Sequence, residues 1–552
     1  MEDNIILSNL IFPDVTKTIK DLEEEYKLRE VEGEVVRSAP SPTGFLHTGS
    51  LFASLITYMI AKQTNGIYYI RIEDTDKKRE VEGSREKFLK QLKTFKLIAD
   101  EYTNEEGKDI GSYGPYIQSK RKEIYHICAK ELVQKGLAYP CFCTPEMLEI
   151  TRSTQEKNKQ RTGYYSSYAR CRSLEIKDAI QRIKNGDKYI LRLRSKGSHL
   201  NKVVLDDKIR GRIEMAQNDQ DTVIIKSDGL PTYHFAHAVD DHFMRTTLVT
   251  RGEEWLASYP LHKELFEALS FKEVSYAHIP VIMIKDGNSK RKLSKRKDLE
   301  ADVEYFLKSG YEVDTVLEYL FTIINSNFES WKLNNDNIFD FEIKLNKMST
   351  SGALFDIDKL NNISKENIAK MKSDNLLDRL IKWSKVYDEK IYNLFSKDLE
   401  YSKNILAIER DSVIKVRKDI VKYSDVYNYY SYFFSDEFKQ DKEKENNLLN
   451  IINEKLTKDV VNKVLENYKK AYKQNNTKEE WFNNMKEVAL SLGFCTDMKE
   501  YKLNKDNYVG SIADFSSIIR VALTNKTNSP DIYSIMQVIG YDETITRLSQ
   551  II

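Results

Sequence analysis

The stretch "RSAPSPTGFLHTGS", Arg37 to Ser50, joins two apolar runs and decides the fold. The run before it, "GEVVRSA" (33–39), is typical of a buried strand. The run after it, "LFASLITYMIAKQTNG" (51–66), has apolar residues at helical spacing, and its final glycine is expected to end the helix. "IYYIRIEDTD" (67–76) then predicts a second strand. Strand, loop, helix and strand in this order indicate the opening of a parallel nucleotide-binding sheet.

The junction between this loop and the following helix predicts an anion site. Unpaired backbone N–H groups and the helix dipole point toward a ligand at such a junction. Gly44 and Gly49 let a ligand approach the backbone closely, and His47 can donate to a phosphoryl oxygen. The stretch is not a Walker A loop, because it contains no GxxxxGK[ST]. Taken alone, the loop could equally be a tight connection with an exposed histidine.

The bulk properties restrict the class of protein but not its partners. A chain of 552 residues is too long for one core, so several domains are expected. Its 31% charged and 41% hydrophobic residues are typical of a soluble globular protein, and a net charge of +1 excludes no partner. No apolar run has the length of a membrane helix, and "MEDNIILSNL" lacks a basic region, so we expect a cytoplasmic protein with no membrane association.

Five segments, in order, resemble the glutamyl type of class I aminoacyl-tRNA synthetases. The opening stretch resembles the "HIGH" signature, with Ser50 in place of the second histidine, and "KLSKR" (292–296) resembles "KMSKS". The other blocks are "RIEDTD" (71–76), "GLPTYHFAHAVDD" (229–241) and "RGEEWL" (251–256). The resemblance is strong over about 33–360 and weaker beyond, where "IIRVALT" (518–524) resembles the closing helical region of the family.

The resemblance implies an α/β fold: a Rossmann-type catalytic domain split by an α/β insertion, then an all-helical anticodon-binding region. We interpret "DTVIIKSDG" (221–229) as the point where the catalytic sheet resumes. The expected parts are an N-terminal helical extension (1–32), the first catalytic half (33–113), an acceptor-binding insertion (114–217), the second catalytic half (218–280), a connecting domain with the KLSKR loop (281–348) and the helical anticodon-binding region (349–552).

The resemblance also implies the reaction, a glutamate–tRNA ligase activity. ATP with Mg2+ would convert L-glutamate into glutamyl-adenylate, and the glutamyl group would pass to the 3' end of tRNA(Glu). In this family the activation step also needs bound tRNA, and a monomer is expected. The implied catalytic residues are His47, Lys292 and Lys295, with Lys295 on the departing pyrophosphate. The implied ATP-binding residues are Gly44, His47, Gly49, Lys292, Ser294 and Lys295.

Glutamate recognition requires cations for two carboxylates and an anion for the ammonium group. Arginine offers a planar fork for a carboxylate, and in the family the position of Arg251 faces the side-chain carboxylate and favours glutamate over glutamine. His237 stands where many members have asparagine. Trp255 could pack or line the pocket. The implied glutamate-binding residues are Arg37, Ala39, Ser41, Glu73, Tyr233, His237 and Arg251.

Three cysteines of the expected insertion offer metal ligands. Cys141 and Cys143 form a CxC motif, and Cys171 follows 28 residues later. Some family members hold structural zinc through CxC, a later cysteine and a tyrosine or histidine, but Ser173 stands where some have the histidine. Zinc requires four ligands in a structural site, so zinc and reduced, packed thiols both remain open. Cys128 fits the apolar pattern of a core helix.

Other readings of the same motifs are kept open. A glutaminyl-tRNA synthetase, a truncated paralogue that glutamylates a tRNA base, and a non-catalytic tRNA-binding derivative share the fold. A non-discriminating enzyme would also charge tRNA(Gln) with glutamate. Arg417 lies near the position where relatives read the anticodon, and this makes it a candidate tRNA contact. The presence of His47, Lys295 and Arg251 favours a catalytic enzyme.

Overall fold

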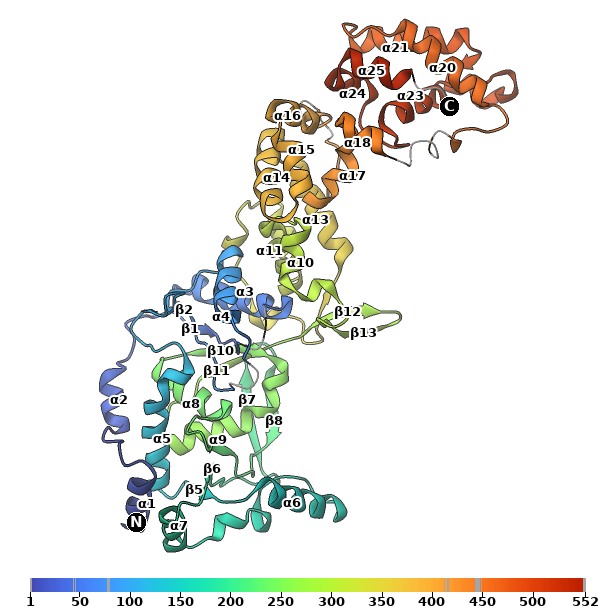
Figure 1. Cartoon of the computed structure of the whole chain (residues 1–552). Helices are drawn as coiled ribbons and strands as arrows, with labels where there is room; N and C mark the ends of the chain where they lie inside the picture. Colours follow the sequence, from blue (N-terminus) through green and yellow to red (C-terminus); the bar gives the residue numbers. More distant parts are fainter. Residues whose placement is uncertain are drawn as a thin grey trace. The chain divides into compact units, whose positions relative to one another are not determined.

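The computed structural model describes residues 2–42, 44, 46–76, 80–411, 413–414, 416–441, 447 and 449–549. The chain divides into two compact units (Figure 1). The first unit is Met1–Tyr305 with Leu317–Asp356, and the second is Phe306–Val316 with Ile357–Ile552. Helices α10 (Val303–Ser309) and α11 (Val313–Ile324) run across the division. In the described part, no helix has the length and apolar character needed to cross a membrane.

The first unit is mixed α/β. Its helices are α1 (Glu2–Ile11), α2 (Ile19–Glu25), α3 (Thr48–Gln63), α4 (Ser84–Thr94), α5 (Lys122–Gln134), α6 (Pro145–Lys157), α7 (Ile176–Lys184), α8 (Tyr233–Phe243), α9 (Tyr259–Leu269) and α12 (Phe328–Lys332). Its strands are β1 (Val35–Ser38), β2 (Ile67–Ile70), β3 (Tyr102–Thr103), β4 (Asp109–Ile110), β5 (Ala138–Cys141), β6 (Ile190–Leu193), β7 (Lys202–Asp207), β8 (Gly211–Ala216), β9 (Val223–Ile225), β10 (Leu248–Gly252), β11 (Ser275–Ile279), β12 (Ile282–Asp286), β13 (Ser289–Lys292) and β14 (Ala353–Phe355).

A parallel α/β layer carries the predicted loop. β1 pairs in parallel with β2, and β10 pairs in parallel with β11. Thr247, just before β10, donates its N–H to the Val35 carbonyl at 3.0 Å and so joins the two pairs. Helix α3 connects β1 to β2, and α9 connects β10 to β11. The predicted strand–loop–helix–strand opening is therefore confirmed, although the second strand ends at Ile70 rather than at residue 76.

The end of α3 corrects one detail of the sequence reading. Helix α3 ends at Gln63, and the left-handed residue after it is Asn65, with φ 53°. Gly66 instead donates its N–H to the Ala61 carbonyl at 2.8 Å, as the residue after a left-handed cap does. A Cβ at Gly66 would lie 2.0 Å from the Glu34 carbonyl oxygen. Gly66 is therefore required by the close approach of the chain entering β1, not by a positive φ.

The strand expected to resume the catalytic sheet belongs to another sheet. β9 pairs antiparallel with β6, which pairs antiparallel with β5, so this strand completes a sheet of the insertion. The hairpin β7–β8 lies within the expected insertion, yet β7 pairs in parallel with β11 of the catalytic layer. The expected boundary at 217/218 therefore does not separate the two sheets. An apolar run indicates a strand, but its local pattern does not specify the partner strand.

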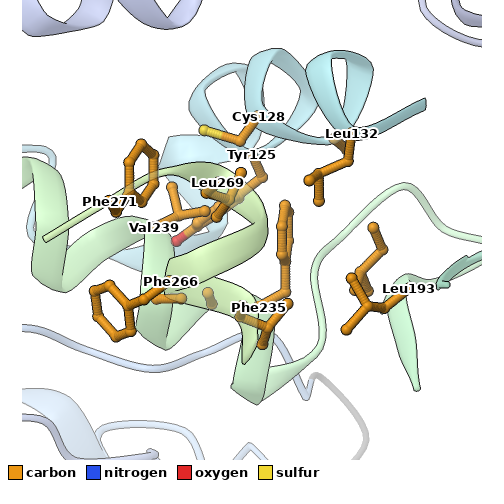
Figure 2. Close-up of a cluster of buried hydrophobic side chains, with 14 of the residues drawn as sticks. Tyr125, Cys128, Leu132, Leu193, Phe235, Val239, Phe266, Leu269 and Phe271 are labelled. Carbon is orange, nitrogen blue, oxygen red and sulfur yellow. The ribbon is translucent and has the colours of Figure 1, made fainter. Parts of the chain in front are cut away.

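The N-terminal helices dock on the first unit. Leu7, Phe12 and Leu22 are buried in a cluster whose centre is formed by α5, α8 and α9. Figure 2 shows this centre, where Cys128 on α5 faces aromatic and aliphatic side chains of the other two helices. Cys128 is fully buried, so the core position predicted for it is confirmed. Burying each large apolar side chain stabilises the fold by about 2 kcal/mol.

The KLSKR stretch begins at the last residue of a β hairpin. Strands β12 and β13 pair antiparallel, and β14 joins β12 in parallel. Lys292 ends β13. The next residue, Leu293, is buried and donates its N–H to the Ile282 carbonyl at 2.9 Å. The hairpin therefore fixes the root of the basic stretch.

In its described residues, the second unit is helical except for one pair of two-residue strands, in agreement with the helical pattern expected beyond residue 349. Two buried clusters, one around Leu380 and one around Phe515, form its core. Its elements are α13 (Ile357–Ala369), α14 (Ser373–Tyr387), α15 (Glu389–Ser396), α16 (Leu399–Ala407), α17 (Val426–Tyr430), α18 (Ser435–Gln440), α20 (Lys458–Ala471), α21 (Lys478–Ser491), β15 (Phe494–Cys495), α22 (Met498–Leu503), β16 (Gly510–Ser511), α23 (Ile512–Thr524), α24 (Ile532–Ile539) and α25 (Tyr541–Leu548).

Candidate active site

A cavity of about 680 Å³ lies in the first unit at the carboxyl ends of β1 and β10. The chain passes from β1 to β2 and from β10 to β11, on opposite sides of this point (Figure 1). Open parallel sheets bind ligands at such a reversal of strand order. The predicted residues that line the cavity are Arg37, Ala39, Ser41, Gly44, His47, Gly49, Glu73, Tyr233, Arg251, Lys292 and Lys295. Trp255 also lines it, while Ser294 and His237 lie outside the lining.

His47 caps helix α3 with its own ring. Nδ1 accepts the Gly49 N–H at 2.9 Å, so a neutral ring carries its proton on Nε2. Burial, followed by the nearby Lys295 and Lys292, lowers the pKa of His47 to about 4, so the ring is neutral at pH 7. The Gly49 N–H was expected to face a phosphate and instead serves this cap. The donor that His47 offers to a ligand is therefore its Nε2–H.

The turn that carries the lysines of the KLSKR stretch is closed by an ion pair between the residues that flank it. Arg291 donates from Nη1 and Nη2 to the two carboxylate oxygens of Asp298, at 2.7 and 2.6 Å. Asp298 also accepts the Ser294 N–H at 2.9 Å, which closes the turn. The Arg291 hydrogen bonds lower the pKa of Asp298 to about 2. Ser294 therefore shapes the turn, while Lys292 and Lys295 line the cavity.

Arg37 is paired with a carboxylate inside the protein. Its Nε and Nη2 donate to Asp241 at 3.0 and 3.2 Å, and its Nη1 donates to the Thr250 carbonyl at 3.2 Å. Asp241 also accepts from Arg71 Nη1 at 2.7 Å. One edge of the Arg37 guanidinium is thus occupied by Asp241. Arg37 and Arg251, the two candidate carboxylate partners, therefore have different surroundings in the structure.

Arg251 is buried and has an unused donor. Its Nε donates to His278 Nε2 at 3.1 Å, and its Nη1 contacts His262 Nδ1 at 3.0 Å. Its Nη2 is buried with no hydrogen-bond partner in the described part of the chain. The guanidinium carbon lies 4.7 Å from the centre of the Tyr276 ring. Because a buried, unpaired cationic donor is costly, this group is suited to a carboxylate ligand in the cavity.

The remaining glutamate candidates surround this arginine at different depths. Tyr233 packs against Trp255 with ring centres 4.3 Å apart, so Trp255 both packs and lines the cavity. Glu73 accepts from Arg71 at 3.0 Å, and burial raises its pKa. His237 is fully buried behind the lining, with Nε2 3.0 Å from the Tyr276 hydroxyl and Nδ1 2.6 Å from Asp241. The structure therefore does not support a direct contact of His237 with a ligand in the cavity.

The three predicted cysteine ligands come together in the insertion. Their sulfur atoms lie within 4.8 Å of one another, and the five cysteines of the chain are free thiols. The Tyr164 hydroxyl lies 3.4 Å from Cys141 Sγ and 3.3 Å from Cys143 Sγ. Tetrahedral ligands about 2.3 Å from zinc are separated by roughly 3.8 Å. The cluster therefore has the spacing of a four-ligand site, with Tyr164 in the position of the fourth ligand.

Comparisons with known proteins place the chain in a family. A family described as "tRNA synthetases class I (E and Q), catalytic domain" matches residues 34–362, and one described as "Anticodon binding domain" matches 505–552. The glutamate–tRNA ligase of Clostridium beijerinckii is 46% identical over 549 residues, which are 99% of this chain and 98% of that protein. The chain belongs to the glutamate–tRNA ligase family. The fold class and the family suggested by the motifs are thereby confirmed.

Further similarities agree with this membership. The glutamate–tRNA ligase of Acetivibrio thermocellus is 41% identical over 551 residues, with 99% of both chains covered. A crystal structure of a glutamate tRNA ligase from Elizabethkingia meningosepticum in complex with its amino acid has a TM-score of 0.74 and 26% identity, and covers 93% of this chain and 98% of that one. A truncated paralogue is inconsistent with these matches, because they extend over the length of full ligases.

Arg417, the candidate anticodon contact, has partners within the second unit. It donates from Nε to Asp419, from Nη1 to the Ser529 carbonyl at 2.9 Å and from Nη2 to Asn528 Oδ1 at 3.0 Å. Each nitrogen of the guanidinium thus joins segments of this unit. These bonds indicate a packing role, and a tRNA contact by Arg417 stays a prediction.

Sequence reasoning missed a group of buried polar residues behind the cavity. Asp241, Asp207, His262 and His278 are all less than 5% exposed and lie behind the cavity lining. The acidic pair in "HAVDDH" was a visible signal for Asp241, because two acids in an otherwise apolar helix need cationic partners. His262 and His278 gave no comparable signal, since each is a single histidine outside the recognised motifs.

Proposed function

We propose that this ligase activates L-glutamate with ATP in the cavity at the ends of β1 and β10, and then transfers the glutamyl group to tRNA(Glu). The observation that carries the proposal is Arg251, whose buried Nη2 has no partner in the described part of the chain. It lines the same cavity as His47 and Lys295. The Arg251 guanidinium is suited to the carboxylate of glutamate, and His47 and Lys295 are suited to the phosphates of ATP.

The pairing of the buried charges favours an amino acid with a carboxylate in its side chain. The buried arginines 37, 71 and 121 are matched by Glu73, Asp240 and Asp241, whereas Arg251 has no such partner among the described residues. L-glutamate carries two carboxylates and one ammonium group at neutral pH, a net charge of −1. In this proposal the side-chain carboxylate binds Arg251 and the Tyr233 hydroxyl, and the ammonium group binds Glu73 and Ser41.

The other end of the cavity is assigned to ATP. The His47 Nε2–H would donate to a phosphate oxygen, and the positive end of α3 adds a favourable field. Lys292 and Lys295 would bind the β- and γ-phosphates, whose charge Mg2+ also neutralises when bound. Burial lowers the pKa of Lys295, so pairing with a phosphate stabilises its charged form.

The two steps balance as follows. An oxygen of the glutamate α-carboxylate forms a bond to the α-phosphorus, and the bond from that phosphorus to pyrophosphate breaks. The terminal ribose hydroxyl of tRNA then attacks the activated carbonyl, loses its proton, and AMP leaves. The side chains position the reactants and stabilise developing charge, which is the main source of rate enhancement in such transfers.

The tRNA is the macromolecular partner in this proposal. The insertion around β5, β6 and β9 would bind the acceptor end, and the helical second unit would bind the anticodon. The match of residues 505–552 to an anticodon-binding domain supports the second assignment. We expect a cytoplasmic monomer. Use of tRNA(Gln) as a second substrate is an alternative that depends on anticodon contacts.

Amino-acid-dependent pyrophosphate exchange tests the glutamate assignment. With tRNA present, the wild type should exchange with glutamate and not with glutamine. Arg251→Ala should lower kcat/KM for glutamate by about 10²-fold or more, because it removes one side of a buried charge pair. The KM for ATP, measured in the same reactions, should stay within about threefold. A variant that keeps the wild-type preference for glutamate over glutamine would show that the assignment of Arg251 is wrong.

We also propose a structural zinc ion in the insertion, held by Cys141, Cys143, Cys171 and Tyr164. The spacing of the sulfur atoms and the Tyr164 hydroxyl supports this ligand set. Zinc at this position would tie the segment after β5 to the segment around residue 171. Metal analysis of the purified protein should give about one zinc per chain, and Cys171→Ser should lose it. Absence of zinc from protein prepared without chelators would favour packed thiols.

A further inference from the structure

Arg251 is held in a different way from the other buried arginines of the catalytic layer. Arg37, Arg71 and Arg121 each contact an aspartate oxygen, at 3.0, 2.7 and 2.6 Å. Arg251 has two histidine rings in the corresponding positions, His278 on Nε and His262 on Nη1. Within the described residues, no carboxylate forms an ion pair with it. Its position is therefore fixed without a direct counter-ion.

The proton on His278 is placed by Asp207. His278 Nδ1 lies 2.7 Å from Asp207 Oδ2, and the His278 backbone N–H donates to the same oxygen at 3.0 Å. A carboxylate accepts hydrogen bonds, so Nδ1 carries the proton and Nε2 keeps its lone pair for the Arg251 Nε–H. One neutral imidazole ring thus separates Arg251 from Asp207. Because Coulomb attraction falls with distance, this spacing weakens the pairing of the two charges.

The proton on His262 follows from the same rule. Arginine has no acceptor, so His262 Nδ1 must accept from Arg251 Nη1 at 3.0 Å. Its proton is then on Nε2, directed at His234 Nδ1 at 2.9 Å. His262 is fully buried, and its ring centre lies 4.3 Å from that of His237. A second neutral ring therefore completes the support of Arg251.

We propose that His262 and His278 are positioning residues that determine selection of glutamate over glutamine. Their neutral rings hold the Arg251 guanidinium by ring lone pairs and leave its charge for the substrate carboxylate. This inference rests on the proposed binding of glutamate by Arg251. A carboxylate in either ring position would neutralise the arginine before substrate binds. Glutamine, whose side chain is neutral, would lose less binding affinity from that change than glutamate.

The surroundings keep both rings neutral. Burial is the largest cause that lowers the pKa of each ring, and the positive charge of Arg251 acts in the same direction. At His278, Asp207 opposes the lowering of the pKa. At His262, His234 and His237 lower the pKa further, and Asp241 opposes the shift. Asp241 is itself engaged by Arg37 and Arg71. The protonated forms, which could not accept from Arg251, are disfavoured at neutral pH.

A matched pair of variants at one position separates charge from shape. His262→Asn keeps a neutral acceptor near the position of Nδ1, and His262→Asp places a carboxylate of the same size there. For each full-length variant, we would measure the KM for glutamate and the inhibition constant of glutamine in glutamate-dependent pyrophosphate exchange. The KM for ATP and the thermal unfolding temperature would be measured as controls.

The proposal predicts a charge-specific result. The KM for glutamate should rise more than tenfold in His262→Asp and less than threefold in His262→Asn. The inhibition constant of glutamine and the KM for ATP should change less than threefold in both. Equal effects of the two variants on the glutamate KM would overturn the proposal and leave His262 a packing residue. A wild type that activates neither amino acid would instead contradict the proposed function itself.

A second pair covers the case in which the aspartate variant does not fold. His278→Gln offers a neutral oxygen near the position of Nε2, and His278→Glu offers a carboxylate there. As for His262, the carboxylate variant should raise the KM for glutamate much more than the neutral variant does, and neither should change the inhibition constant of glutamine. If folded His278→Glu keeps the wild-type ratio of the two constants, the proposal is wrong for this position too.

Discussion

His47 caps α3 with one ring nitrogen, and in the proposed function its other ring nitrogen donates to a phosphate. Nδ1 accepts the Gly49 N–H and caps the helix, which is the role that Asn, Asp, Ser and Thr usually have. Nε2 keeps the proton, and the lowered pKa keeps the ring neutral. A Cβ at Gly49 would lie 3.2 Å from Nδ1, so glycine leaves room for the capping contact. The cap therefore fixes the orientation of the ring, from which the proposed donation of Nε2–H to a phosphate would take place.

Substitution at His47 should separate these two functions. His47→Asn keeps a capping oxygen but loses the distant donor, so kcat for glutamate activation should fall about 10²- to 10³-fold while the unfolding temperature stays constant. His47→Ala should lose the same activity and about 1 kcal/mol of stability as well. Pyrophosphate exchange and thermal unfolding measure the two effects. Wild-type activity in His47→Asn would contradict the donor role.

At the residue scale, the sequence motifs predict the groups that line the cavity but not the groups behind them. His47, Lys295 and Arg251 occur in short motifs that resemble the family. The Arg37–Asp241 pair joins positions 204 residues apart, and no local pattern specifies such a partner. The different surroundings of Arg37 and Arg251 became apparent only from these distant contacts.

The β12–β13 hairpin and the turn after it form the element that presents Lys292 and Lys295. The Arg291–Asp298 pair closes the turn from both ends, and Asp298 also accepts the Ser294 N–H. The structure shows a turn anchored at Leu293 and closed by this ion pair. The ion pair therefore closes the backbone turn that carries the two lysines.

Weakening this closure should affect catalysis more than glutamate binding. Asp298→Asn removes the charge-assisted pair with Arg291, so kcat should fall roughly tenfold or more with little change in the KM for glutamate. Lys295→Ala should lower kcat to a larger extent, again with little change in the KM for glutamate. Steady-state exchange at varied glutamate provides both constants. An increase in the KM for glutamate without loss of kcat would rule out a role of the closure in positioning the lysines.

At the element scale, the hydrophobic pattern of the sequence predicted the positions of helices and strands better than it predicted which strands pair. The strand at 35–38 and the helix at 48–63 occur where they were predicted. The strand β9 also exists, but it pairs with β6 instead of the catalytic strands. Strand pairing depends on tertiary packing, and the local sequence carries little information about it. The two-residue strands β15 and β16 are too short to give a periodic signal.

The whole molecule combines two compact units with separate cores. A chain with 86 basic and 85 acidic residues has almost no net charge, yet the catalytic layer buries several arginines and carboxylates. The net charge of the chain therefore gives no indication of the local excess of positive charge at Arg251, on which the proposed selection depends. The sequence placed the start of the helical region at residue 349, close to the Ile357 at which the main part of the second unit begins. It assigned residues 306–316 to the connecting domain, whereas the structure groups them with the second unit.

A charging assay tests the central claim most directly. The purified full-length protein would be incubated with ATP, Mg2+ and labelled glutamate or glutamine, separately on tRNA(Glu) and tRNA(Gln) transcripts. We predict that glutamate, and not glutamine, becomes attached to tRNA(Glu). Attachment of glutamate to tRNA(Gln) as well would identify a non-discriminating enzyme. Failure to charge tRNA(Glu), although the tRNA is bound, would contradict the proposed reaction.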